Sequence, residues 1–251
     1  MSNVTRRKLL TGGLAAAAGA SGLALAAKLA RQYGLIPPDG GGLYGPGETL
    51  TYAAQLLMTR HSLAREFRRE QISNPPFPNE VGPLGEAFRR LQAGGFADWR
   101  LAVDGMVARP AVFSLSELRS FPRHSQITHL ACEEGWSYIA EWTGVRLASL
   151  LDLVEIRPEA RYVVFEPFPN PRQTTGVVRV LAGSIDMADA VHPQTLLAYG
   201  MNGDALPADH GAPVRLRLGR HLGYKNTKYL SRIILAHKID FKGRGTWYGG
   251  I

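Results

Sequence analysis

Residues 129–145 read HLACEEGWSYIAEWTGV and contain the only cysteine of the 251-residue chain, Cys132. Two glutamates and a glycine follow this cysteine directly, and two tryptophans lie close by. A single cysteine cannot form a disulfide within its own chain. The thiol is therefore an inert buried group, a link to another chain, a nucleophile or a metal ligand.

The composition is that of a globular protein, with 45% hydrophobic and 20% charged residues. A length of 251 residues suits one large domain, or one domain with a small appendage. The formal net charge of +8 fits either an anionic partner or an ordinary solvated basic surface. We expect no nucleic-acid partner, because no block of lysines and arginines is interleaved with aromatic residues.

Residues 1–30 have the features of a twin-arginine export signal. Arg6 and Arg7 lie in a basic start, and an uncharged stretch of mainly alanine, glycine and leucine continues to Lys28. We therefore expect the protein in the periplasm or another extracytoplasmic space. The leader is either cleaved, with a small-x-small site at residues 24–26, or retained as a membrane anchor. An N-terminal amphipathic helix is the alternative interpretation.

The sequence after the leader predicts a proline- and glycine-rich linker, residues 31–48, and one domain, residues 49–251. The domain is expected to begin with a strand or extended lead-in and a short helix over 49–70. Alternating apolar residues predict one strand before Asp104-Gly105 and another after it. Further strands are expected at 124–132, 160–168, 195–207 around an Asn-Gly turn, 212–220 and 228–239.

Short helices are predicted after Ser114 or Ser116, over 143–156, and, as a helix or turn, before Pro193. Many short strands combined with a few helices indicate an α+β fold class that is rich in β-structure.

Several common catalytic motifs are absent from the sequence. It contains no G-x-S-x-G elbow, no P-loop and no HExxH zinc motif. A cysteine–histidine hydrolase would pair Cys132 with His129, His192 or His221. The sequence contexts of papain-like and caspase-like enzymes are missing, so this alternative has no further support.

The segment that begins at Cys132 resembles the metal-binding stretch of the sulfite oxidase-type molybdopterin-dependent oxidoreductase family. The resemblance is closest to the exported bacterial branch that contains the catalytic subunit of the periplasmic methionine sulfoxide reductase. That branch has a cysteine followed by Glu, a small residue, Trp and Ser, and then W-x-G before an amphipathic helix. The matching residues here are Cys132, Glu134, Gly135, Trp136, Ser137, Trp142 and Gly144.

A second signature of the family resembles the C-terminal part of this chain. It consists of His-Pro, then GAPVRL, then G-aromatic-K-x-x-K, which correspond to residues 192–193, 211–216 and 223–228. Residues 98–118 resemble the family's entry hairpin. The resemblance runs from about residue 98 to the end, with weaker support from about residue 57. It implies a molybdopterin-binding fold of mixed sheets and short helices.

The resemblance implies a molybdenum-molybdopterin cofactor, with Cys132 as the metal ligand and catalytic centre. A thiolate suits this metal, whereas an apolar buried thiol is the alternative. The cofactor's phosphate requires hydrogen-bond donors and positive charge. The matching positions predict these cofactor contacts: His61, Asn79, His192, His210, Arg215, Asn226, Thr227 and Lys228.

Some of these positions have an equally simple structural interpretation. Arg215 would also suit a solvent-facing strand position, His192 a turn before a proline, and His61 a partly buried helix. His210 stands where the relative has an asparagine. Glu133 or Glu134 is either close to the metal or a solvated carboxylate.

Two departures from the family bear on the reaction. Sulfite-oxidising relatives usually carry an arginine two positions before the cysteine, where this chain has Leu130. Sulfite is a dianion, so its oxidation is disfavoured unless Arg172 restores the positive charge. The C-terminal dimerisation domain is missing, and no C-x-x-C-H haem motif is present. We therefore expect a monomer that exchanges electrons with a separate membrane or periplasmic partner.

The predicted function is two-electron oxygen-atom transfer on a small-molecule or sulfoxide-type substrate. The alternatives are a sulfite dehydrogenase-like enzyme and a cofactor-binding or partner-binding module without catalysis.

Overall fold

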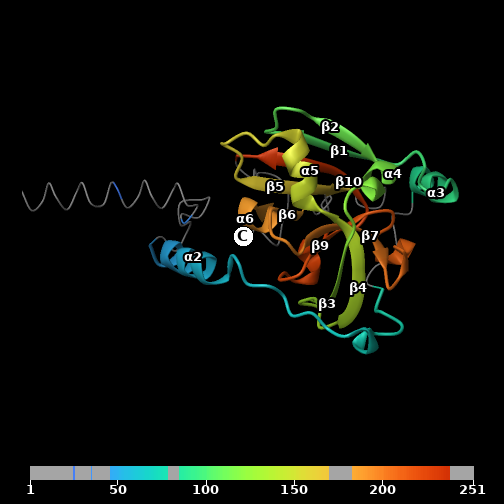
Figure 1. Cartoon of the computed structure of the whole chain (residues 1–251), viewed down its shortest axis with the longest axis horizontal. Coiled ribbons are helices and arrows are strands. Elements are labelled where there is room, and N and C mark those ends of the chain that lie inside the picture. Colours follow the sequence, from blue (N-terminus) through green and yellow to red (C-terminus); the bar gives the residue numbers. More distant parts are fainter. Residues whose placement is uncertain (1–24, 26–34, 36–45, 79–84, 170–182, 238–251) are drawn as a thin grey trace, which may run out of the picture. The chain divides into compact units, whose positions relative to one another are not determined.

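The computed structural model describes residues 25, 35, 46–78, 85–169 and 183–237 (Figure 1). By its contacts the chain divides into two compact units, Met1–Ser62 and Leu63–Ile251. The predicted export signal lies almost wholly outside the described residues. None of the helices in the described part of the chain combines the length and apolar character that a membrane crossing requires.

The first unit contains helix α2, Pro46–Thr59. The predicted strand or extended lead-in at this position is wrong, since residues 49–59 are helical. Residues 52–58, YAAQLLM, contain no β-branched side chain, and alanine, leucine, methionine and glutamine favour helix.

The second unit contains two sheets, and the first has the strand order β2-β1-β10-β5-β6. Strands β1 and β2 are antiparallel, as predicted, and β1 runs parallel to β10. The predicted turn at Asp104-Gly105 is wrong, because both residues belong to β1 and pair with β10, and residues 106–110 make the connection to β2. Figure 1 shows β1, β2, β5 and β10 side by side. The bounds are β1 Arg100–Gly105, β2 Ala111–Ser114, β5 Tyr162–Pro167, β6 Gly183–Asp186 and β10 Leu230–Ala236.

The second sheet has the order β3-β4-β7-β8, and β9 also pairs with β7. The β3–β4 hairpin is its longest ladder, with partners from His124↔Gly144 to Ala131↔Ser137. The bounds are β3 His124–Ala131, β4 Ser137–Arg146, β7 Thr195–Met201, β8 Asp204–Ala205 and β9 Arg215–Leu218.

The helices of the second unit are short. α4, Leu115–Ser120, begins at Ser114, whose side chain accepts from the N–H of Glu117, and this confirms the predicted cap. The other bounds are α3 Glu86–Ala93, α5 Leu147–Val154, α6 Met187–Ala190, η2 Arg69–Gln71, η4 Ala208–His210 and η5 Gly223–Lys225.

The predicted helix over 143–156 begins later than expected, because residues 143–146 belong to strand β4. Gly144 lies directly against the backbone of Leu197 and Ala198 in β7, where a Cβ atom would clash. This close approach is a strand–strand contact, so the glycine marks the end of a strand and not the start of a helix.

The core of the second unit has two parts. The larger cluster includes α5, the inner side of the first sheet and the side chains of Leu216 and Leu218. The smaller cluster contains Leu130, Trp142 and their neighbours from β3, β4 and β7. Successive residues of a strand point to opposite faces, so Arg215 and Arg217 project from the face of β9 opposite to the two leucines.

Candidate cofactor site

The single cysteine lies at the tip of the β3–β4 hairpin. The backbone N–H of Cys132 donates to the carbonyl oxygen of Trp136 at 3.0 Å, and the N–H of Gly135 donates to that of Cys132 at 3.1 Å. Gly135 has φ +91°, a conformation that favours glycine. The turn therefore holds the thiol at the end of a rigid ladder, and the residue is only partly exposed.

Two carboxylates lie beside the thiol. The Sγ of Cys132 donates to Oε2 of Glu133 at 3.1 Å, and the indole N–H of Trp136 donates to Glu134 at 2.7 Å. Burial, together with the hydrogen bond and the negative charge of Glu133, raises the pKa of the thiol. The free thiol is therefore protonated at neutral pH, and a metal that binds it must displace the proton.

The loop of η5 approaches the hairpin tip very closely. A Cβ atom at Gly223 would lie 3.0 Å from Cβ and 3.1 Å from Sγ of Cys132, and 2.9 Å from the ring of Trp136. Only a residue without a side chain fits this gap unless a neighbour moves. The two signature segments, which are far apart in the sequence, are thus in contact in the fold.

Two arginines of β9 are buried and have no acidic partner in the part of the chain that the structure describes. Their exposed fractions are 2% for Arg215 and 0% for Arg217. Arg215 donates to the carbonyl oxygens of His210 at 2.8 Å and Asn226 at 3.2 Å. Neither arginine forms an ion pair with any carboxylate in the described ranges. The interpretation of Arg215 as a solvent-facing strand residue is therefore wrong.

Among the described residues, the guanidinium of Arg217 is bonded only to neutral oxygens. It donates to Oδ1 of Asn226 at 3.0 Å, to Oγ1 of Thr128 at 2.9 Å and to the carbonyl oxygen of His129 at 2.8 Å. It also donates to the carbonyl of Leu218. Burial and the charge of Arg215 lower the pKa of Arg217 to about 9. The protein thus holds positive charge here that its own described residues do not balance.

Several buried polar atoms around the arginines lack hydrogen-bond partners among the described residues. Both guanidinium groups lie over the ring of Trp142, at 4.9 and 5.4 Å from its centre. Buried polar groups in proteins nearly always have partners, so a cluster of unsatisfied ones indicates a missing ligand. The unsatisfied atoms of this cluster are Nε1 of Trp142, Nδ1 of His210, Nε of Arg215, Nε of Arg217 and Oγ1 of Thr227.

This arrangement fits an anionic group that accepts hydrogen bonds and also reaches a thiol. A phosphate-bearing pterin with a metal at its sulfur end has these properties. Comparison with known proteins points to the same group. The family model described as oxidoreductase molybdopterin binding domain matches residues 90–242.

This chain belongs to the molybdopterin-binding oxidoreductase domain family.

Two curated relatives are similar in sequence. One is the putative protein-methionine-sulfoxide reductase subunit YedZ1 of Azospira oryzae, 35% identical over 185 residues. The match covers 72% of this chain and 66% of the relative. The other is the protein-methionine-sulfoxide reductase catalytic subunit MsrP of Ralstonia nicotianae, 35% identical over 146 residues, or 56% of this chain and 44% of the relative. The chain thus spans less than two thirds of either relative.

A solved structure is also similar. The sulfane dehydrogenase SoxCD from Paracoccus pantotrophus matches with a TM-score of 0.51 and 25% identity over 57% of this chain and 39% of its own. These findings confirm the predicted family, the β-rich α+β fold and a molybdenum-molybdopterin cofactor.

Five of the residues predicted for molybdopterin binding lie together in the second unit. Arg215, Asn226 and Thr227 are buried, and so is His210, whose ring lies 5.7 Å from that of Tyr138. Lys228 donates to the carbonyl oxygen of Asp209 at 2.7 Å. Asn226, Thr227 and Lys228 directly follow the η5 loop, whose Gly223 lies against Cys132. Their direct contact with the cofactor stays a prediction.

The other predicted contacts are His192, His61 and Asn79. His192 is buried in the turn before β7, where its Nδ1 accepts from the N–H of Gln194 at 3.2 Å. The structure thus gives His192 the turn position that the sequence also suggested. His61 is exposed and belongs to the first unit. Asn79 and Arg172 lie outside the described residues.

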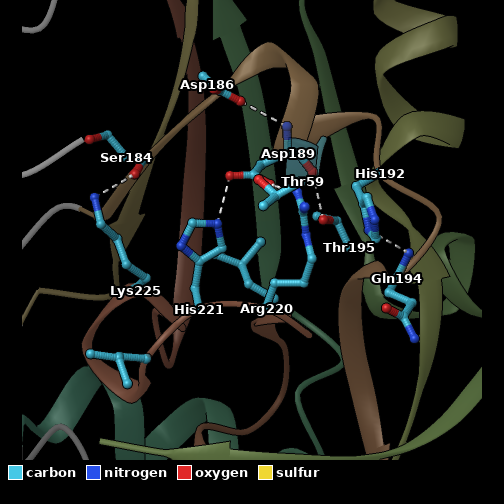
Figure 2. A network of polar contacts seen from close by, with 12 residues as sticks. Thr59, Ser184, Asp186, Asp189, His192, Gln194, Thr195, Arg220, His221 and Lys225 are labelled. Atoms are coloured by element: carbon cyan, nitrogen blue, oxygen red, sulfur yellow. Dashed lines mark hydrogen bonds and ion pairs between the residues drawn. The ribbon is translucent and has the colours of Figure 1, made fainter. Parts of the chain in front are cut away.

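The sequence did not single out the charged network that holds the η5 loop (Figure 2). Asp189 of α6 contacts Arg220 and also Nε2 of His221, the latter at 2.6 Å. Burial alone would raise the pKa of Asp189, but these two contacts outweigh it and hold the pKa below its ordinary value. Asp189 is ionised at neutral pH, and it therefore fixes the residues that directly precede Gly223.

Arg217 and Trp142 were also missed as site residues. The signal for Trp142 was its place in the W-x-G motif. The signal for Arg217 was the alternation of residues 215–218, which predicts opposite faces but not whether the polar face is buried.

Proposed function

We propose that the chain is an exported molybdenum-cofactor-dependent oxidoreductase that carries out two-electron oxygen-atom transfer. The observation that carries this proposal is the meeting of the Cys132 hairpin with a buried, unbalanced pair of arginines. The thiol and the positive charge lie in one folded unit and are joined by the loop at Gly223.

Different residues would bind the two ends of the cofactor. Cys132 would bind the metal through its thiolate, and the two arginines with Thr227 would donate to the anionic end of the pterin. When bound, the cofactor supplies two-electron redox chemistry and oxygen-atom transfer. Trp136, whose carbonyl oxygen accepts from the N–H of Cys132, stacks its ring on Tyr138 with the ring centres 6.0 Å apart.

The surroundings of the thiol favour a neutral sulfoxide over anionic sulfite. Leu130, the position of the missing strand arginine, is 1% exposed and packs in the smaller core cluster. The exposed side chains next to Cys132 are the carboxylates of Glu133 and Glu134, which would repel a dianion. In the proposed direction a sulfoxide takes up two electrons and two protons and yields a thioether and water.

The electrons would come from a separate membrane or periplasmic protein, because the sequence contains no C-x-x-C-H haem motif. We propose residues 1–30 as a twin-arginine signal, 31–48 as a linker and 49–251 as the oxidoreductase domain, acting as a monomer outside the cytoplasm. Arg6-Arg7 and the uncharged stretch behind them support this assignment. The names of the two curated relatives support a sulfoxide substrate.

The proposal is tested by metal analysis of protein from a host that makes the molybdenum cofactor. We expect about one molybdenum per chain in the wild type and loss of the metal's thiolate absorption in Cys132→Ala. Turnover is then measured with a reduced artificial donor and small sulfoxides, and in reverse with sulfite and an artificial acceptor. Wild-type protein without molybdenum would overturn the cofactor assignment. Faster sulfite oxidation than sulfoxide reduction would overturn the substrate class in favour of a sulfite dehydrogenase.

A further inference from the structure

Arg217 has no role in the signatures that place this chain in its family. The signature GAPVRL, residues 211–216, includes Arg215 and ends one residue before Arg217. The alternation of β9 nevertheless brings the two side chains to one face of the strand. Both guanidinium groups lie over the same indole ring, that of Trp142.

The hydrogen bonds of Arg217 join the strand that carries the thiol to the loop that faces it. Through Thr128 and His129 the guanidinium holds the end of β3, three residues before Cys132. Through Oδ1 of Asn226 it holds the η5 loop. Asn226 is bonded further, since its Oδ1 also accepts from the backbone N–H of Leu218 at 2.8 Å. One side chain therefore links β3, which leads into the Cys132 turn, to the residue that directly follows the η5 loop.

The charge of Arg217 is not needed for these bonds, because every acceptor is neutral. A fully buried charge without a counter-ion destabilises a protein, and the neighbouring charge of Arg215 adds repulsion. Contact with the indole ring offsets only part of this cost. A neutral amide such as glutamine would make fewer bonds but would avoid the penalty. The arrangement is favourable when an anion is present beside both arginines.

We propose that Arg217 is a positioning residue for the bound cofactor, which adds positive charge beside Arg215 and sets the Cys132 strand against the Gly223 loop. This inference rests on the proposed function, since it concerns the same site. Arg217 acts on the thiol through the backbone of β3 and through Asn226.

Only an arginine can both add positive charge beside Arg215 and link the Cys132 strand to the Gly223 loop. Its planar fork donates in fixed directions to acceptors on two different elements, which a lysine cannot reproduce. Arg217→Lys therefore keeps the charge and loses the link, whereas Arg217→Met keeps much of the volume and loses both. The matched control is Arg146→Met, which removes an exposed arginine from β4.

The test uses full-length protein from a host that makes the molybdenum cofactor, and it has three readouts. These are molybdenum per chain, pterin per chain after oxidation to its fluorescent form, and the unfolding temperature of protein with and without cofactor. For Arg217→Met we expect molybdenum occupancy to fall about tenfold or more. The unfolding temperature of its cofactor-free form should fall less than that of its loaded form, because the loss of an unbalanced buried charge offsets part of the loss of its hydrogen bonds.

For Arg217→Lys we expect pterin to be retained better than molybdenum, together with a shifted metal–thiolate absorption band. Arg146→Met should match the wild type in every readout. The inference is overturned if the Arg217 variants keep wild-type occupancy and spectrum. It is equally overturned if Arg217→Met lowers the unfolding temperature of the cofactor-free protein as much as that of the loaded protein, since the role is then structural.

These outcomes are separable from failure of the proposed function. Wild-type protein that contains no molybdenum would overturn the proposed function whatever the variants do. Wild-type protein with molybdenum, next to unaffected Arg217 variants, would overturn only the role of Arg217. If Arg217→Met does not fold, the occupancy and spectrum of Arg217→Lys decide the question.

Discussion

Both faces of strand β9 are buried, but they differ in whether their side chains find all their interaction partners among the described residues. Leu216 and Leu218 pack into the larger core cluster, where apolar neighbours surround them. Arg215 and Arg217, on the other face, bond only neutral oxygens and leave both Nε atoms unsatisfied among the described residues. The exposed Arg232 of β10, by contrast, contacts the carboxylates of Asp104 and Glu166. The apolar face of β9 thus serves folding, and its arginine face is complete only with a ligand.

The largest expected effect separates the two faces directly. Leu216→Ala should lower the free energy of unfolding of the cofactor-free protein by about 2–5 kcal/mol, because it opens a cavity in a packed core. Arg215→Met should cost the cofactor-free protein much less, since it removes an unbalanced buried charge. Denaturant unfolding with and without cofactor measures both. The comparison fails if Arg215→Met destabilises the cofactor-free protein as much as Leu216→Ala.

His210 should make the stability of the protein depend on pH, because it is buried close to the arginine face. Burial, followed by the charges of Arg215 and Lys228, lowers the pKa of His210 to about 4, although Asp209 opposes this. Between pH 6.5 and 4 the unfolded chain therefore binds a proton that the folded chain does not, and stability falls as the pH is lowered.

The loss should approach about 3 kcal/mol at the acid end, since each pKa unit corresponds to about 1.4 kcal/mol. His210→Asn, which keeps a polar side chain but removes the titratable ring, should flatten this part of the stability profile. An unchanged slope between pH 6.5 and 4 in the variant would show that His210 is not the group responsible.

The smallest expected change in stability concerns the contact between the loop and the thiol. Gly223→Ala should cost about 1–3 kcal/mol, because the new methyl group meets Cys132 and Trp136 at close range. Molybdenum occupancy should fall more clearly than stability, since the thiol is displaced. The control is Gly94→Ala, whose Cβ would meet neighbours only at 3.5 Å and beyond. Equal effects of the two substitutions on occupancy would contradict a special role for Gly223.

The sequence was most informative where local pattern decides the structure. The antiparallel pairing of β1 with β2, the Ser114 cap and the strand–turn–strand at Asn202-Gly203 were predicted and are present, although the turn between β1 and β2 comes later than Asp104-Gly105. Each depends on residues only a few positions apart. The order of the signature motifs was enough to predict the family and the cofactor.

Features that depend on distant segments were missed. The polar face of β9 is buried because β3 and β4 cover it, and the contact from Arg217 to Thr128 spans 89 residues. Alternation alone cannot distinguish a solvated polar face from one that lines a site. Strand β4 was partly assigned to a helix because residues 147–154 carry a strong helical pattern, and the expected helix included Gly144. The close contact of this glycine with β7 exists only in the folded sheet.

The central claim is that the Cys132 hairpin and the arginine face of β9 form one molybdenum-cofactor site. X-ray absorption at the molybdenum edge tests it most directly, with loaded wild-type protein and Cys132→Ser as samples. The account predicts that the metal in the wild type has one sulfur ligand more than the metal retained in the variant. Equal sulfur coordination in the two samples would contradict it and would leave Cys132 as a thiol without a role at the metal.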